Sequence, residues 1–268
     1  MKVGLIGAGF IGTTLAKVME KMKEIEVIYL IDNSPAQARA LADALSKVTA
    51  VENLETVLPK VDLVIEAASQ EAVKKYAVKV LNAGKDLMVL SVGAFGDENL
   101  WKRVQNSAKK HNSRVYIPSG AVCGIDGLKS AGIAQIQCVI IETTKPPKAL
   151  QGAPYISKHK IDLTKITKPT VIFEGTAREA VSHFPKNINV AAVVSLAGIG
   201  FDKTRVKLVA DPNATRNTHN IHVKGRFGEF NCRIDNMPSM TNPKTSYLAA
   251  LSAIATLKKI VHGVWLGT

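Results

Sequence analysis

A glycine-rich motif near the start of the chain has the spacing of a phosphate-binding turn. It lies between an apolar segment, Lys2–Ile6, and a sequence that predicts a helix, Phe10–Met22. The residues of the motif are Gly7, Ala8, Gly9, Phe10, Ile11 and Gly12. In such a turn the first glycine permits a tight bend, the second lets the backbone approach a pyrophosphate, and the third lets the helix pack closely on a strand. The pyrophosphate would lie at the positive end of the helix dipole, so the motif predicts a dinucleotide site.

An acidic residue stands where the ribose of a dinucleotide is expected. Asp32 comes twenty positions after Gly12, at the end of the apolar segment Val27–Ile31. A carboxylate there accepts hydrogen bonds from ribose hydroxyls, whereas a 2′-phosphate would meet its negative charge and usually requires an arginine. The next residues are Asn33 and Ser34, which favours NAD, with NADP as the alternative.

Small residues follow a third apolar segment, Asp62–Ile65. Ala67, Ala68 and Ser69 would let a dinucleotide cross the carboxyl ends of the strands. The alternative is an ordinary strand-to-helix loop in which Ser69 is the N-cap. The sequence leaves both interpretations open.

A second glycine-rich stretch, residues 119–127, lies where the pattern of the sequence changes. Its glycines suit a hinge, and backbone N–H groups in such a turn can hold a carboxamide or a carboxylate. Cys123 within it raises the alternative of thioester chemistry. That chemistry needs a nearby base and a lowered thiol pKa, neither of which the sequence indicates, so we interpret Cys123 as a structural thiol.

Two histidines lie in a polar segment that reads as a loop leading into a strand. His219 and His222 have opposite parity, so on a strand they point to opposite faces. No Cys, Asp or Glu stands at metal-ligand spacing, and we predict no metal site. The neighbours Arg216, Asn217 and Thr218 are the polar company expected of a general acid or base beside an anion. An exposed loop histidine is the alternative.

Asn187 and Asn189 open an otherwise apolar helix, expected over residues 187–197. Capping of the helix explains one asparagine but does not easily explain both. A buried helix start also places side-chain amides where they can meet a nicotinamide or an anionic substrate.

The scaffold predicted for residues 1–118 is a doubly wound α/β domain. Short apolar runs alternate with amphipathic stretches, which is typical of parallel βαβ units whose sheet is covered on both faces. We expect helices after the glycine motif, from Pro35 to Leu45, over Glu71–Asn82 and over Glu98–His111.

Beyond Pro118 the strands become longer and more alternating, which predicts an α+β domain on an open, mostly antiparallel sheet. Gly225 indicates a tight hairpin within it, and residues 145–168, rich in proline and lysine, predict a long loop. We therefore divide the chain into a domain of residues 1–118, a domain of residues 119–242, and a C-terminal helix within 243–268 that packs back on the first domain.

The composition excludes several classes of protein. With 46% hydrophobic and 21% charged residues, the chain is globular rather than disordered. Three widely spaced cysteines exclude a disulfide framework and a zinc ribbon. No apolar run is long enough to span a membrane, and we expect a cytoplasmic protein. Residues 119–268 hold 19 Lys and Arg against 9 Asp and Glu, but dispersed lysines and 5% aromatic residues argue against nucleic acid as the partner.

These motifs together resemble the L-aspartate dehydrogenase family. The resemblance covers essentially the whole chain and rests on GAGFIG, SGAVCGIDGL, FPKNINVAA, DPNATRNTHNIHVKGRFGEF and NPKTSYLAALSAIATL. The first motif is generic to dinucleotide enzymes, whereas the later four in this order are more specific. The resemblance implies a Rossmann domain, a catalytic α+β domain, a homodimer, and NAD(P)-dependent oxidation of L-aspartate. The implied products are iminoaspartate and then oxaloacetate and ammonia, on the route to NAD biosynthesis.

The resemblance also implies roles for single residues. The active-site histidine falls on His219, and the nicotinamide contacts fall on the backbone amide of Ala121 and on Asn189, with Asn187 as a rival for the latter. Two substrate carboxylates need basic or polar partners. The candidates for that role are Lys186, Arg216, Thr218 and Lys224. Cys123 departs from the family pattern, which is often glycine-rich or apolar at that point.

Two other functions remain open from the sequence. One is a related two-domain enzyme for another small acid, of the homoserine dehydrogenase or dihydrodipicolinate reductase type. The histidine-rich motif with a downstream lysine and the SGT segment of the second type are absent from the sequence. The other is a non-catalytic protein that binds NAD as a sensor.

Overall fold

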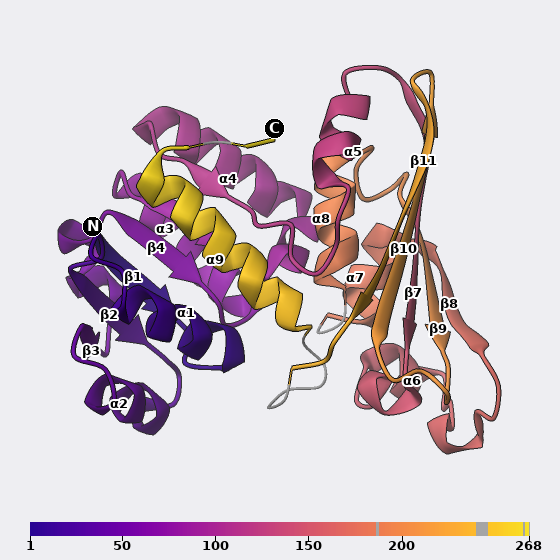
Figure 1. The fold of residues 1–268 in the computed structure, drawn as a ribbon, viewed down its shortest axis with the longest axis horizontal. Coiled ribbons are helices and arrows are strands. Elements are labelled where there is room, and N and C mark those ends of the chain that lie inside the picture. Colours follow the sequence, from indigo (N-terminus) through magenta and orange to yellow (C-terminus); the bar gives the residue numbers. More distant parts are fainter. Residues whose placement is uncertain (186–187, 240–245, 265, 268) are drawn as a thin grey trace. The chain divides into compact units, whose positions relative to one another are not determined.

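The computed structural model describes residues 1–185, 188–239, 246–264 and 266–267. The chain folds as two compact units. The first comprises Met1–Pro118 and Ala250–Val264, and the second comprises Ser119–Ala249 and the last residues of the chain. Each unit is built on its own β-sheet (Figure 1).

The first unit contains a six-stranded parallel sheet in the order β3-β2-β1-β4-β5-β6. Its strands are β1 (Lys2–Ile6), β2 (Val27–Ile31), β3 (Val48–Ala50), β4 (Leu63–Glu66), β5 (Asp86–Val89) and β6 (Val115–Tyr116). All four residues of β4 are buried, as expected for a central strand covered on both faces. The order reverses between β1 and β4, which is the point where a doubly wound sheet binds its ligand at the carboxyl ends of the strands.

Helices cover both faces of this sheet (Figure 1). They are α1 (Phe10–Glu20), α2 (Pro35–Asp43), α3 (Gln70–Asn82), α4 (Glu98–His111) and α9 (Tyr247–His262), with 3-10 turns η1 (Leu54–Thr56), η2 (Leu58–Lys60) and η3 (Val92–Gly96). Ala253 and Leu257 of α9 are fully buried in one core cluster with Leu15 and Met19 of α1. The last helix of the chain is therefore part of the first unit, although the second unit separates the two in sequence.

The second unit contains a five-stranded mixed sheet in the order β11-β10-β7-β9-β8. Its strands are β7 (Ile136–Lys145), β8 (Thr170–Thr176), β9 (Arg205–Ala210), β10 (Asn217–Gly225) and β11 (Gly228–Asn236). The β7–β9 pair is parallel and the other pairs are antiparallel. The hairpin predicted at Gly225 is confirmed, because Gly225 pairs with Gly228 across a two-residue turn. The predicted fold class is confirmed for both units.

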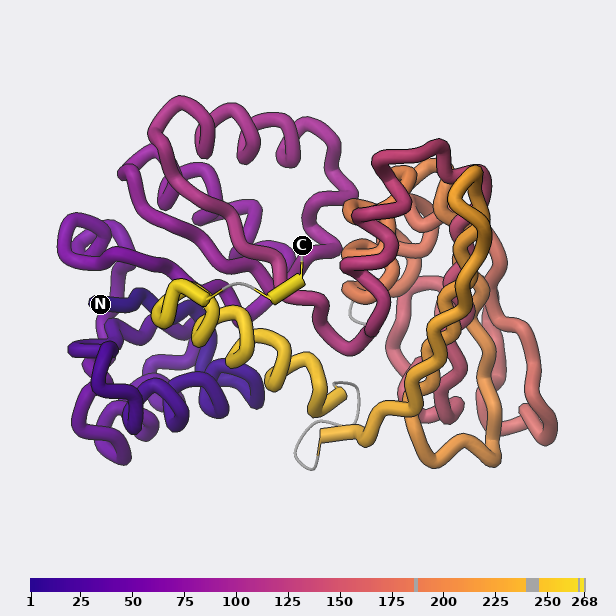
Figure 2. The backbone as a smooth tube through the Cα atoms, turned by 45° about the horizontal axis from the view of Figure 1, so that its top comes forward, coloured from indigo at the N-terminus to yellow at the C-terminus, as the bar shows by residue number. Residues whose placement is uncertain are grey.

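The helices of the second unit are α5 (Ile125–Ala131), α6 (Pro154–Lys158), α7 (Ala177–His183) and α8 (Asn189–Ala197). The segment predicted as a long loop, residues 145–168, contains short helical turns: η4 (Pro147–Leu150), α6 and η5 (Leu163–Lys165). The tube in Figure 2 shows these turns as small coils in the connection from β7 to β8. Alanine, leucine and isoleucine side chains anchor it, since Ala149, Leu150 and Ile156 are buried.

The predicted elements differ from the structure in detail, since α1 and α2 each end two residues earlier than expected, at Glu20 and Asp43. The short strand β3 was not predicted, because its three residues, Val-Thr-Ala, are too few to establish a period. The last helix was expected from about Pro243; the described helix begins at Tyr247, and residues 240–245 lie outside the described part of the chain.

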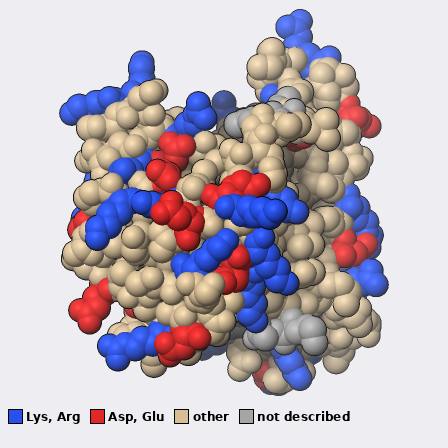
Figure 3. Space-filling model, turned by 60° about the vertical axis from the view of Figure 1, so that its left-hand side comes forward, with Lys and Arg blue, Asp and Glu red and all other residues tan. Residues whose placement is uncertain are grey.

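Among the helices described, none is long and apolar enough to cross a membrane. On the face drawn in Figure 3, basic and acidic side chains are interleaved.

Candidate active site

The three glycines of the phosphate-binding turn have different surroundings. Gly7 has φ +106°, and a Cβ there would lie 2.7 Å from the carbonyl oxygen of Ala67. A Cβ on Gly12 would overlap the carbonyl oxygen of Gly7. A Cβ on Gly9, by contrast, would have no atom within 4 Å. The open space therefore lies above the second glycine, where a pyrophosphate is expected to approach, and this geometry fits a dinucleotide.

The start of α1 is prepared for a negative charge. Gly9 is the N-cap, and no side chain of the described residues caps the first turn. The N–H groups of a first helical turn have no partner within the helix and can bind an anion. Asp32 borders the same turn: its carboxylate accepts hydrogen bonds from the backbone N–H of Ala8 and of Ser34, each at 2.7 Å. Asp32 thus connects the end of β2 to the glycine-rich turn.

Glu66 is a residue of this region that was not predicted as part of the site. It ends β4, is 1% exposed, and accepts four hydrogen bonds. Oε1 accepts from the N–H of Ala68 and of Ser69 at 2.8 Å and from the hydroxyl of Ser91 at 2.9 Å; Oε2 accepts from the N–H of Ser91 at 2.9 Å. Burial raises the pKa of Glu66, while these bonds favour its ionised form. An acidic residue at the end of a wholly apolar strand was the available signal.

The loop after β4 has both features that the sequence suggested. Ser69 is the N-cap of α3, and its hydroxyl accepts from the N–H of Ala72 at 3.2 Å. Ala67 and Ala68 lie against the glycine-rich turn, since a Cβ on Gly7 would be 3.0 Å from the Cβ of Ala68. The capping role of Ser69 and a place for small residues beside the turn are therefore compatible.

In the second unit, His219 is buried on one face of the sheet. It is 2% exposed, and its Nδ1 lies 2.9 Å from the hydroxyl of Thr143 on β7. Burial lowers the pKa of His219 to about 3, and the positive charge of Lys145 contributes to this shift. The imidazole is therefore neutral at physiological pH. It is not the exposed loop histidine that the sequence left as an alternative.

Strand register places other polar side chains beside His219. His219 is opposite Thr143 and Thr218 is opposite Thr144, so the same register brings Asn217 level with Lys145. Asn236 of β11 pairs with Asn217 on the other edge of β10. These five inward residues form what we call the inner polar cluster: Thr143, Lys145, Asn217, His219 and Asn236, all of them buried.

Lys145 is the charged member of the inner polar cluster. Its side chain is 4% exposed, and burial lowers its pKa to about 8. From the sequence, Lys145 was expected only as the start of a loop. The cluster depends on pairing between strands more than seventy residues apart, which no local pattern reveals.

Hydrogen bonds from its two asparagines connect the inner polar cluster to neighbouring residues. The amide of Asn236 donates to the carbonyl oxygen of Ala121 at 2.9 Å. The amide of Asn217 donates to the hydroxyl of Ser246 at 3.3 Å. The other amide atom of Asn217, Oδ1, is buried and has no hydrogen-bond partner among the residues that the structure describes. Ala121, one of the predicted nicotinamide contacts, is thus brought close to the strand that carries His219.

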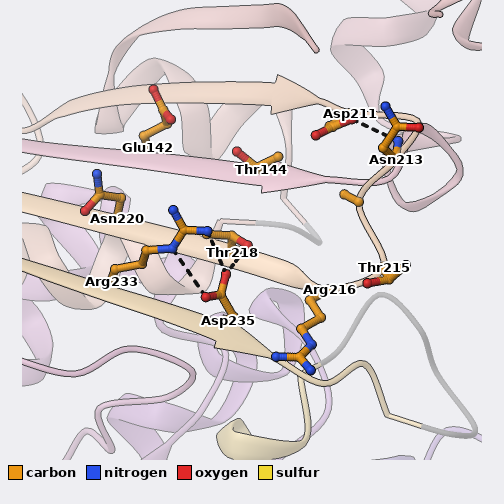
Figure 4. Close-up of a pocket in the computed structure, with 11 residues that line it drawn as sticks. Glu142, Thr144, Asp211, Asn213, Thr215, Arg216, Thr218, Asn220, Arg233 and Asp235 are labelled. Atoms are coloured by element: carbon orange, nitrogen blue, oxygen red, sulfur yellow. Dashed lines mark hydrogen bonds and ion pairs between the residues drawn. The ribbon is translucent and has the colours of Figure 1, made fainter. Parts of the chain in front are cut away.

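Three substrate-binding candidates are not brought to the inner polar cluster. Thr218 and Lys224 have the opposite parity to His219 on β10 and point to the other face of the sheet. Thr218 donates there to Asp235 at 2.6 Å, as Figure 4 shows. Arg216 is exposed and lines the same outer pocket. Because side chains alternate along a strand, Thr218 and Lys224 cannot contact a ligand on the face of His219.

The remaining candidates lie elsewhere in the second unit. Asn189 is the first residue of α8 and is half-buried; the N-cap position is Ile188, so Asn189 does not cap the helix. Lys186 and Asn187 lie outside the described residues. His222 is on the outer face beside Asn231, with 2.9 Å between Nδ1 and Oδ1, so the two histidines do point to opposite faces as predicted.

Cys123 is exposed, and its side chain contacts Cys232 of β11. Burial and the Cys123 thiol raise the pKa of Cys232. A raised thiol pKa lowers the thiolate fraction at neutral pH. The contact of Cys123 that the structure describes is thus with a second thiol.

Comparison with known proteins covers the whole chain. Residues 126–260 match the family model described as aspartate dehydrogenase, C-terminal, and residues 7–118 match that described as homoserine dehydrogenase, NAD binding domain. The L-aspartate dehydrogenases of Methanosarcina mazei and Methanococcoides burtonii are 50% and 49% identical to it, over the full length of both chains in each case. The crystal structure of aspartate dehydrogenase from Thermotoga maritima superimposes with a TM-score of 0.80 at 32% identity, covering 100% of this chain and 99% of that one. The chain therefore belongs to the L-aspartate dehydrogenase family.

Proposed function

We propose that this protein oxidises L-aspartate at Cα with NAD as the acceptor and releases oxaloacetate and ammonia through iminoaspartate. The observation that carries the proposal is a neutral, buried histidine beside a buried lysine in a chain of this family. A histidine held in this way can serve as a general base, and the lysine supplies positive charge for an acidic substrate.

The glycine-rich turn, Asp32 and the loop after β4 are the groups proposed to hold the cofactor. Gly9 leaves room for the pyrophosphate, which would lie at the N-terminus of α1, where backbone N–H groups and the helix dipole favour an anion. Asp32 would accept hydrogen bonds from the ribose, and its charge favours NAD over NADP. We assign the nicotinamide to the backbone N–H of Ala121 and to Asn189 or Asn187. When bound, the nicotinamide accepts the hydride that leaves Cα of the substrate.

We propose that His219 acts on the water that hydrolyses the imine. A base needs a free lone pair on Nε2, so the ring proton must be on Nδ1 and is donated to the Thr143 hydroxyl. Nε2 then takes a proton from water as the water oxygen bonds to the imine carbon, and the imidazolium returns this proton to the imine nitrogen to give the carbinolamine. In the collapse of the carbinolamine, Nε2 takes the hydroxyl proton and passes it to the nitrogen as the C–N bond breaks, which leaves the ketone and releases ammonia. A substrate with two carboxylates brings negative charge, which raises the pKa of His219 from its low value toward neutrality.

The substrate carboxylates need partners on the side of the sheet that carries His219. Lys186, which lies outside the described residues, stays a candidate for this role. Thr218, Lys224 and Arg216 do not, because Thr218 and Lys224 point to the opposite face and Arg216 lines the outer pocket there.

A substrate screen that follows NADH absorbance tests the proposal. We expect activity with L-aspartate and none with homoserine or 2-hydroxy acids. His219→Ala should reduce turnover at least a thousandfold while NAD binding, measured by calorimetry, stays within threefold of the unmodified protein. Activity with homoserine alone would instead indicate the related dehydrogenase, and NAD binding without any turnover would indicate a sensor.

The cellular setting of the reaction is also a proposal. We expect a cytoplasmic homodimer whose imine product feeds pyridine nucleotide synthesis before it is hydrolysed. The outer face of the second sheet exposes Ile140 and Val171, at 36% and 49%, which supports contact between subunits there. Light scattering after size-exclusion chromatography measures the mass, and a monomer at micromolar concentration would contradict this expectation.

A further inference from the structure

Lys145 and Asn217 stand side by side on the buried face of the second sheet. Lys145 ends β7 and Asn217 begins β10, and the β7–β10 register brings them level, one row beyond the His219–Thr143 pair. Neighbouring residues across antiparallel strands have Cβ atoms about 5 Å apart. The two side chains and His219 are thus within reach of one small molecule.

The two groups differ in what they can bind. Lys145 carries an ammonium group that only donates hydrogen bonds and is attracted to anions. Asn217 Oδ1 only accepts hydrogen bonds, and it is buried without a partner among the described residues, although its amide nitrogen is held by Ser246. Leaving a buried acceptor unpaired costs free energy, so a ligand that donates a hydrogen bond to Asn217 Oδ1 is favoured there, and a ligand that is also negative is attracted to the ammonium group of Lys145.

An α-amino acid presents the complementary pair on one carbon atom. Its carboxylate accepts hydrogen bonds and is negative, and its amino group donates them. We propose that Lys145 binds the α-carboxylate of the substrate and that Asn217 Oδ1 accepts a hydrogen bond from its α-amino group. This pair orients Cα beside His219. The inference rests on the proposed function for the identity of the substrate, but the binding of an amino acid can be measured without turnover.

The test uses the NADH-loaded protein, which cannot oxidise aspartate, and follows binding by NADH fluorescence. The probes are L-aspartate and succinate, the same four-carbon diacid without the amino group. Lys145→Met should weaken the binding of both probes about 100-fold, because each loses a charged partner for its carboxylate. Asn217→Leu should weaken aspartate about 10-fold or more and leave succinate within threefold, because succinate has no amino group.

Further variants separate binding from folding. Lys145→Arg keeps the charge and should recover part of the affinity. Lys207→Met is the matched control: Lys207 lies on the outer face of β9 in an ion pair with Glu142 and should leave both dissociation constants unchanged. Lys145→Met removes a buried charge, so its melting temperature should equal or exceed that of the unmodified protein. If Asn217→Leu does not fold, Asn217→Ala provides the same comparison of the two probes.

Several results would overturn the inference. In the first, Lys145→Met binds both probes within threefold of the unmodified protein. In the second, Asn217→Leu loses the same factor of affinity for aspartate and for succinate. In the third, the unmodified protein binds neither probe. If the first or second result is found and the unmodified protein still turns over aspartate, the proposed function holds and this subsite is wrong. Binding that depends on Lys145 and Asn217 without any turnover would retain the subsite and reject the proposed function.

Discussion

Replacing the second or the third glycine of the phosphate-binding turn with alanine separates cofactor binding from folding. At Gly9 the backbone has φ −70° and ψ −170°, which alanine adopts without strain, and the added Cβ meets no atom within 4 Å. Alanine is a poorer N-cap than glycine by about 0.5 kcal/mol, and the loss of glycine freedom in the unfolded chain offsets about as much. We therefore expect Gly9→Ala to leave the melting temperature within about 2 °C.

Gly12→Ala should behave in the opposite way. Its Cβ would overlap the carbonyl oxygen of Gly7, which is backbone and cannot rotate aside. Overpacking of this kind costs up to about 3 kcal/mol, from which a helix-propensity gain of about 1 kcal/mol is subtracted. The net loss of about 2 kcal/mol corresponds to a melting temperature about 4–8 °C lower.

Cofactor affinity should show the reverse order. The methyl group of Gly9→Ala occupies the space in which the pyrophosphate would meet the N–H groups of α1. Losing one or two hydrogen bonds to a charged group weakens binding about 100-fold, or about 2.7 kcal/mol. Scanning fluorimetry without cofactor and calorimetric titration with NAD provide the two measurements. NAD binding by Gly9→Ala within threefold of the unmodified protein, or equal destabilisation by the two variants, would refute the reasoning.

Three other changes have defined outcomes. Asp32→Asn keeps the size of the side chain and removes its charge. The ratio of NAD affinity to NADP affinity, measured by titration with each cofactor, should fall at least tenfold. An unchanged ratio would show that Asp32 does not select the cofactor. Glu66→Gln turns an NH₂ group toward N–H and O–H donors that now donate to a carboxylate. We expect the free energy of unfolding, measured in urea, to fall by about 2 kcal/mol. A fall of less than about 0.5 kcal/mol would contradict the hydrogen bonds described for Glu66. Because the pKa of His219 is lowered to about 3 in the folded protein, between pH 6.5 and about pH 3 its imidazole is protonated in the unfolded chain but not in the folded one. The free energy of unfolding should therefore fall by roughly 1.4 kcal/mol for each pH unit of acidification through that range. The pH dependence should flatten in His219→Gln, and an unchanged dependence would count against the neutral, buried imidazole.

Much of the first unit was predictable because its signals are local. Strands β1 and β2 have the predicted bounds, since each is a short apolar run ended by glycine or by Asp32. Helix α4 also has the predicted bounds, with Asp97 as N-cap and basic residues in its last turn. The parity of His219 and His222 correctly predicted that they point to opposite faces.

The inner polar cluster was not predictable in the same way. Lys145 lies at the boundary between a strand and a proline-rich segment, where a lysine normally indicates solvent. Its burial results from the pairing of β7 with β10 and β9, and register between distant strands is fixed by the whole sheet rather than by the residues near Lys145. The same register moved Thr218 and Lys224 away from His219, although proximity in sequence had grouped them.

The bonds of Glu66 have a consequence for any redesign of the loops at the carboxyl ends of β4 and β5. One carboxylate serves the loop that follows β4 and the loop that follows β5, so neither loop can be reshaped alone without leaving donors of the other unpaired. An engineer who exchanges residues 67–69 for those of a relative would have to transplant the segment around Ser91 with them. The loop after β4 and the loop after β5 therefore form one structural unit.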